Sequence, residues 1–164
     1  VAQILIPRTF GNDHRILVNN GSVVGKEFYR VFISEELVET VGIALNSTLG
    51  ILQREVIASA GLGGGALKLS TESASKFLVP NHQISFPVGV VESFLKRETL
   101  PIALELGYTS ESWGGEQDLN RVPEDRLEID RVLLNWLGLD LGDLEQLYAA
   151  TARLVKQRDS KSRS

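Results

Sequence analysis

The chain has 164 residues, a net charge of −4 and 43% hydrophobic residues, which is typical of one soluble globular domain, with or without an appendage. It has no cysteine and two histidines, which excludes a disulfide framework and a thiolate metal site and argues against a metal centre. No run approaches about 18 consecutive apolar residues, so the sequence predicts no membrane-spanning helix, and we expect no membrane partner and a cytoplasmic location.

Charge is distributed unevenly along the chain. Residues 1–97 hold 9 basic and 8 acidic residues, residues 98–145 hold 3 basic and 12 acidic ones, and the remainder is basic again. A bound nucleic acid is therefore expected against the first part, away from the acidic segment. The chain begins with Val1 and contains no methionine, so we expect it to be a domain excised from a larger protein.

The first segments have the pattern of a twisted antiparallel sheet. Strand-like sequence covers residues 3–10, 15–18 and 22–34, and turn residues separate these runs at 11–13 and 19–21. Pro7 marks an edge or an end of the first strand, because proline cannot donate to a ladder of hydrogen bonds.

One long amphipathic helix is predicted next, with Ser34 as its N-cap. Its apolar stripe recurs at spacings of three and four residues, at Leu37, Val41, Leu45, Leu49, Leu52 and Val56. Asn46 and Ser47 lie beside this stripe. They either fix the loop that follows or satisfy neighbouring backbone groups, and we favour the second role.

A glycine cluster follows the helix, at Gly61, Gly63, Gly64 and Gly65. Glycine permits positive φ and the close approach of a ligand or another backbone. The alternative is a flexible surface loop.

Residues 66–70 then have the pattern of a short strand, in which Lys68 points away from Leu67 and Leu69. A cation beside a glycine turn suits a phosphate contact, and a solvent-facing lysine is the alternative. Ser70 or Thr71 is expected to cap a short helix after this strand.

The second half is predicted to be helical. We expect a linker at residues 81–87, a helix over 88–96 and a loop over 109–117, with Trp113 packed back on the domain. Pro123 suits the first turn of a helix, and a break at residues 138–140 leads into a second helix capped by Asp140. The expected fold is therefore α+β: a small twisted antiparallel sheet packed with one long helix, followed by a C-terminal αα-hairpin. We divide it into a core over residues 1–87 and a helical part over 88–164, forming one structural unit.

The order of these segments resembles the C-terminal target-recognition domain of adenine-specific DNA methyltransferases of restriction–modification systems. It is also similar to the half-domains in specificity subunits of Type I restriction enzymes. The resemblance extends from Gln3 to about Arg163 and is weakest over residues 81–117. The matching residues are Leu45-Asn46-Ser47, Gly63-Gly64-Gly65-Ala66-Leu67-Lys68-Leu69, Leu78-Val79-Pro80, Arg126, Asp130, Leu137-Gly138-Leu139, Glu145, Tyr148, Leu154-Val155 and Arg158.

This resemblance implies double-stranded DNA as a partner, and a catalytic methyltransferase domain in the same parent chain. It also implies S-adenosylmethionine as the cofactor of that parent protein. Arginine and lysine can anchor phosphates or read guanine, and asparagine can pair with adenine. The expected DNA-contacting residues are Arg8, His14, Arg15, Asn19, Asn20, Lys26, Arg30, Gly63, Gly64, Gly65 and Lys68. For each of the polar residues among them, the alternative is an ordinary solvated side chain.

Catalytic motifs are missing from the sequence. There is no Pro-Pro pair, so the Asn/Asp-Pro-Pro-aromatic motif that grips adenine in these methyltransferases is not present. The alternating strands and helices of a domain that binds S-adenosylmethionine are missing too. We therefore expect a non-catalytic domain without a cofactor of its own, which reads DNA while another domain supplies the chemistry. A protein–protein interaction domain built on the αα-hairpin is the alternative, and a small independent enzyme is the least favoured reading.

Overall fold

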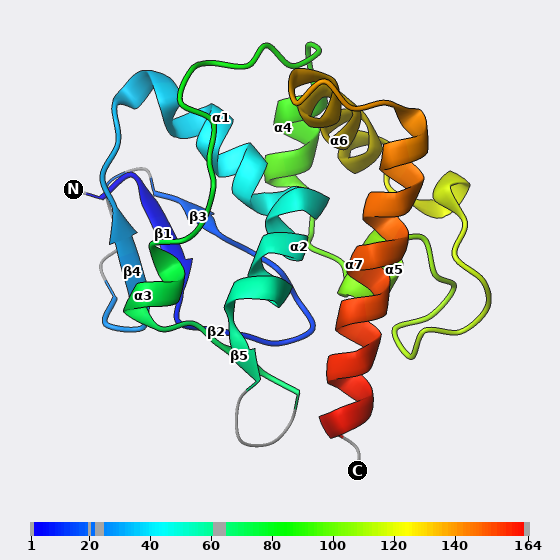
Figure 1. Cartoon of the computed structure of the whole chain (residues 1–164). Helices are drawn as coiled ribbons and strands as arrows, with labels where there is room; N and C mark the ends of the chain where they lie inside the picture. The colour runs from blue at the N-terminus through cyan, green and yellow to red at the C-terminus, as the bar shows by residue number, and fades with distance from the viewer. Residues whose placement is uncertain (1, 20, 22–24, 61–64, 163–164) are drawn as a thin grey trace.

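The computed structural model describes residues 2–19, 21, 25–60 and 65–162. Its architecture is α+β, as predicted, with the strands gathered on one side of a helical assembly (Figure 1). No helix in these described ranges is both long enough and apolar enough to span a bilayer.

The strands form two small antiparallel sheets instead of the single sheet expected. In the first, β1 (Ile4–Pro7) lies between β3 (Leu17–Val18) and β4 (Phe28–Val31). In the second, β6 (Leu67–Lys68) lies between β2 (Thr9–Phe10) and β5 (Ser59–Ala60).

Arg8 is the point at which the first predicted strand divides between the two sheets. Its backbone N–H donates to the carbonyl of Glu27 at 2.9 Å, just before β4, and its carbonyl accepts from the N–H of Leu69 at 2.9 Å, just after β6. The two peptide groups of one residue therefore join both sheets.

The prediction of one long helix was wrong. The segment forms α1 (Glu35–Asn46) and α2 (Thr48–Ile57), because Ser47 takes an extended conformation and caps α2 with its hydroxyl, which accepts from the N–H of Gly50 at 3.3 Å. After this break, the most deeply buried residues are not the ones that the predicted stripe contained. Val56, predicted inside, is 66% exposed, whereas Ile51 and Arg54 are fully buried.

Asn46 and Ser47 satisfy neighbouring backbone groups, which confirms the role that we favoured. The Asn46 amide donates to the carbonyls of Ile16 and Gly42 at 2.8 Å, and its oxygen accepts from the N–H of Ile16 at 2.8 Å. This side chain thereby fixes the segment that leads into β3 against the end of α1.

The predicted short helix and linker are confirmed. Ser70 caps α3 (Thr71–Ala74) by accepting from the N–H of Ser73, and residues 81–87 form no helix or strand. Next come α4 (Val90–Lys96), α5 (Ile102–Glu105) and a 3-10 helix at Leu119–Arg121. Trp113 packs back on the domain, edge-on to Tyr108, and its Nε1 donates to Asp159 at 2.8 Å.

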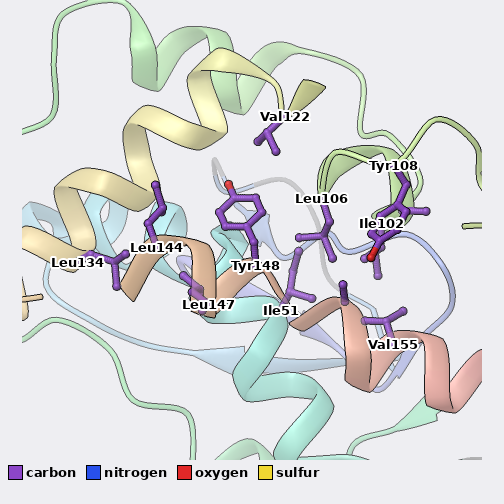
Figure 2. Close-up of a cluster of buried hydrophobic side chains, with 12 residues drawn as sticks. Ile51, Ile102, Leu106, Tyr108, Val122, Leu134, Leu144, Leu147, Tyr148 and Val155 are labelled. Carbon is purple, nitrogen blue, oxygen red and sulfur yellow. The ribbon is translucent and has the colours of Figure 1, made fainter. Parts of the chain in front are cut away.

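The C-terminal αα-hairpin is also confirmed, as α6 (Glu124–Trp136) and α7 (Leu141–Ser162). Asp140 accepts from the N–H groups of Gly142 and Asp143, at 2.7 and 3.2 Å, and so caps α7. Side chains from α2, α5, α6 and α7 pack into one buried cluster around Tyr148, which includes Ile51, Leu106, Leu134 and Val155 (Figure 2). Because α2 lies inside this cluster, the helical part and the long helical segment of the first part share a core.

Candidate nucleic-acid interface

Three of the predicted DNA-contacting cations lie close to the junction of the two sheets. Arg8 is exposed at the junction itself, and its guanidinium lies 4.6 Å from the centroid of the Tyr29 ring. Lys68 is exposed on β6, paired with Thr9, while Leu67 and Leu69 are buried, which confirms the predicted alternation. Lys26 is exposed one residue before Glu27, whose carbonyl binds the N–H of Arg8.

Arg30 lies on β4, on the face that points away from the core. Its neighbours Tyr29 and Val31 pack against the cluster under the first sheet, so Arg30 projects to the other face. Phe32, two residues further, is 67% exposed. An exposed aromatic ring near a cation suits stacking and phosphate contact with a nucleic acid.

Arg15 is exposed just before β3, at the other edge of the first sheet. It lines a cavity that α4 closes from the opposite side. Asn19 is occupied by its own turn, because its amide donates to the carbonyl of Ala2 at 2.8 Å and its oxygen accepts from the N–H of Gly21 at 3.3 Å. It is therefore less available to a base than its position in a turn suggested.

His14 lies in the core, not on the surface. The residue is 4% exposed, stacks on Phe10 with ring centroids 5.6 Å apart, and places Nε2 2.7 Å from the carbonyl oxygen of Leu45. Burial, helped by the charge of Arg54, lowers the pKa of His14 well below its ordinary value, so the ring is neutral and Nε2–H donates to Leu45. This position conflicts with the predicted DNA contact, and we remove His14 from the candidate interface.

The C-terminal helix binds Gly65, the last residue of the glycine cluster. Gly65 has φ +68°, which glycine adopts without strain, and its carbonyl accepts from the guanidinium of Arg158 on α7. Arg158 also binds Glu55 at 3.1 Å, and Glu55 binds the fully buried Arg54 at 2.8 Å. Gly63, Gly64 and Asn20, also expected in the interface, lie outside the described residues.

Arg54 was missed by the sequence analysis. Its guanidinium lies 4.9 Å from the ring centroid of Phe10, and burial lowers its pKa to about 10, which still leaves it charged at neutral pH. The Arg54–Glu55–Arg158 chain of contacts holds α2 and α7 together.

A second group of internal ion pairs joins α4, α5 and α6. Glu105 accepts from Arg97 at 2.7 Å and from Arg126 at 2.6 Å, and Arg97 also binds Asp125 at 2.9 Å. Of these residues the sequence analysis named Arg126 alone, as part of the family resemblance, and it did not predict the ion pairs. The adjacent Lys96-Arg97 pair, at the end of a predicted helix, was the one local signal of a basic site.

Nine of the arginines and lysines thus form two contrasting groups. Arg54, Arg97, Arg126 and Arg158 are engaged in ion pairs that hold helices together. The surface cations, by contrast, are exposed and form no ion pair with any residue that the structure describes; they are Arg8, Arg15, Lys26, Arg30 and Lys68. Comparisons with protein-family models, with curated proteins and with solved structures found no match to this chain.

Proposed function

We propose that this chain is the target-recognition domain of an adenine-specific DNA methyltransferase and is not catalytic by itself. The observation that supports this function is the set of surface cations on and beside the two sheets, which lack ion-pair partners among the described residues. Unpaired, exposed cations on one part of a chain with a net charge of −4 suit a polyanion such as DNA.

The chemistry would then reside in another domain of the parent protein. Both described sheets are antiparallel, whereas the domain that binds S-adenosylmethionine in such enzymes is a doubly wound, largely parallel sheet. In this arrangement the target-recognition domain selects the site on double-stranded DNA, and the catalytic domain receives the extruded adenine and holds the cofactor.

Charge reversal at the surface cations tests this function. We expect Lys26→Glu, Arg30→Glu and Lys68→Glu each to weaken binding of a DNA duplex about ten-fold, which corresponds to one charge-assisted contact. In each variant, the slope of the logarithm of the binding constant against the logarithm of the salt concentration should also become shallower, by about the amount that one phosphate contact contributes. Fluorescence anisotropy of a labelled mixed-sequence duplex, titrated at several salt concentrations, measures both quantities.

Arg153→Glu provides the matched control, because Arg153 is exposed on α7 and belongs to neither sheet. Equal losses for Arg153→Glu and the three sheet variants would mean that binding responds to net charge alone. That result, or no binding by the unmodified chain joined to its catalytic domain, would rule out the proposed interface.

A protein-interaction role is the second candidate function, and an apolar groove supports it. The groove has a volume of about 240 Å³ and lies between the segment after α3 and the C-terminal end of α6. Its walls include Leu78, Val79, Trp136 and Leu137, whose side chains are exposed, Leu78 to 79%. Exposed apolar residues that gather around a groove are typical of interaction sites. The occupant that we favour is the catalytic domain of the parent chain.

We expect the double substitution Leu78→Asp/Leu137→Asp to abolish association with a separately produced catalytic domain, as measured by isothermal titration calorimetry. Placing two carboxylates in a buried apolar interface would leave both without partners. Val88→Asp is the control, because Val88 is fully exposed but does not line this groove. If both variants bind as the unmodified chain does, the groove is not the contact surface.

A further inference from the structure

A cleft between β3 and α4 has a charge opposite to that of the protein as a whole. This β3–α4 cleft has a volume of about 510 Å³, and four cationic side chains line it, against the single carboxylate of Glu105; the cations are Arg15, Lys96, Arg97 and Arg126. The whole chain carries a net charge of −4. A neighbouring cavity of about 460 Å³ is acidic instead, since Glu124, Asp125 and Glu128 line it beside one arginine.

The carboxylate in the β3–α4 cleft is neutralised by its neighbours. Oε1 of Glu105 accepts from Nη1 of Arg97 at 2.7 Å, and Oε2 accepts from Nη2 of Arg97 at 2.7 Å and from Nε of Arg126 at 2.6 Å. Glu105 therefore positions the two guanidinium groups in the wall of the cleft and adds little net negative potential for an entering anion.

Three cationic groups keep the capacity to bind such an anion. Arg15 is exposed and makes no hydrogen bond or ion pair to any described residue. Nη2 of Arg126 is in none of the hydrogen bonds that Arg126 forms within the described structure. Lys96 pairs with Glu92 at 2.6 Å across one helical turn, and such exposed pairs contribute too little to stability to prevent exchange for a phosphate.

The rest of the cleft wall is apolar and comes from both sides. Ile16, Leu17 and Val18 contribute from β3 and the residue before it, and Phe94 and Leu95 contribute from α4. A cavity of several hundred Å³ with apolar walls and a few convergent charged groups has the size and character of a small-ligand site. A nucleotide combines the features that these walls would bind, namely a phosphate for the cations and a largely apolar base and sugar.

We propose that the β3–α4 cleft binds a phosphate group of a nucleotide, with Arg15 and Lys96 at its mouth and Arg126 within its wall. The phosphate belongs either to a DNA strand or to a free nucleotide. The DNA strand as source rests on the function proposed above, and it would extend the DNA-contacting surface of the protein past Arg15 onto α4. The second source is independent of that function.

The test compares Arg15→Ala/Lys96→Ala with the matched control Arg153→Ala/Lys76→Ala. Lys76 pairs with Glu72 at 2.8 Å across one helical turn, as Lys96 does with Glu92. Both lysines and both glutamates are exposed. The ligands are 2′-deoxyadenosine 5′-monophosphate and inorganic phosphate, followed by amide chemical shifts of the ¹⁵N-labelled chain, and a labelled DNA duplex, followed by anisotropy. We expect the cleft variant to bind at least one of them ten-fold or more weakly than the control does.

The pattern of losses identifies the source of the phosphate. If the cleft variant loses affinity for the duplex alone, the phosphate belongs to DNA. If the unmodified chain binds no DNA and the cleft variant loses affinity for the free nucleotide, the cleft proposal is supported and the DNA-recognition function is ruled out. If the duplex binds equally well to the cleft variant and the control, and neither free ligand shifts the amides of Leu17 or Leu95, the cleft proposal is overturned. The function proposed above survives that outcome.

Discussion

Replacing Asp130 with alanine is expected to lower the free energy of unfolding by about 4 kcal/mol, because two buried donors would lose their acceptor. Asp130 on α6 is fully buried. Its Oδ1 accepts from the N–H of Thr48 at the start of α2, at 2.9 Å, and its Oδ2 accepts from the hydroxyl of Tyr148 on α7, at 2.5 Å. Burial raises the pKa of Tyr148, so this hydroxyl keeps its proton and remains the donor. One carboxylate thus joins three helices.

Urea unfolding followed by circular dichroism measures this effect. The matched control is Glu145→Ala on α7, an exposed carboxylate whose removal should change stability by less than about 0.5 kcal/mol. Tyr148→Phe and the double variant complete a thermodynamic cycle, and we expect the two losses to be clearly non-additive because the side chains are in direct contact. Additive losses would show that Asp130 acts through Thr48 alone.

The same contact explains why the sequence predicted one helix where there are two. The spacing of apolar residues over 37–56 is continuous, so local periodicity contains no sign of a break. The break at Ser47 is stabilised by the Ser47 hydroxyl and also by Asp130, which lies 82 positions away from Thr48 and accepts from the N–H that the new helix end exposes. By contrast, the cap at Asp140 and the alternation at Lys68 depend on near neighbours, and both were predicted correctly.

The candidate interface also shows that a local sequence pattern does not predict contacts between residues far apart in the chain. Residue type and local pattern predicted that Arg8, Lys26, Arg30 and Lys68 would be exposed, and they are. Type alone could not predict that His14 would be buried, since its neighbours in the fold are Phe10 and the end of α1. Arg54 is the reverse case. As a charged residue, Arg54 is expected at the surface. It is buried because it pairs with Glu55, which is also bound by Arg158, 103 positions further along the chain.

The cluster around Glu105 is expected to make the protein sensitive to acid. Burial alone would raise the pKa of this carboxyl group, but the hydrogen bonds from Arg97 and the charge of Arg126 outweigh it and lower the pKa from 4.5 to about 2. A carboxyl group whose pKa is lower in the folded state than in the unfolded state stabilises the fold above its unfolded pKa. That contribution, about 3 kcal/mol, is therefore present above pH 4.5 and is lost as the pH falls towards 2.

Glu105→Gln isolates this contribution, because glutamine keeps the shape of the side chain and removes the titration. At pH 7 we expect the variant to be less stable than the unmodified chain by about 3 kcal/mol, since the buried guanidinium of Arg126 would lose its counter-charge and Arg97 would keep Asp125 alone. At pH 3 the difference in free energy of unfolding between the variant and the unmodified chain should be clearly smaller, because the unmodified chain is losing the same interaction. Glu98→Gln, at an exposed position close by in sequence, should follow the unmodified chain at both pH values. A constant difference between Glu105→Gln and the unmodified chain from pH 7 to pH 3 would show that Glu105 stabilises the fold through packing, and that its ionisation has no part in acid unfolding.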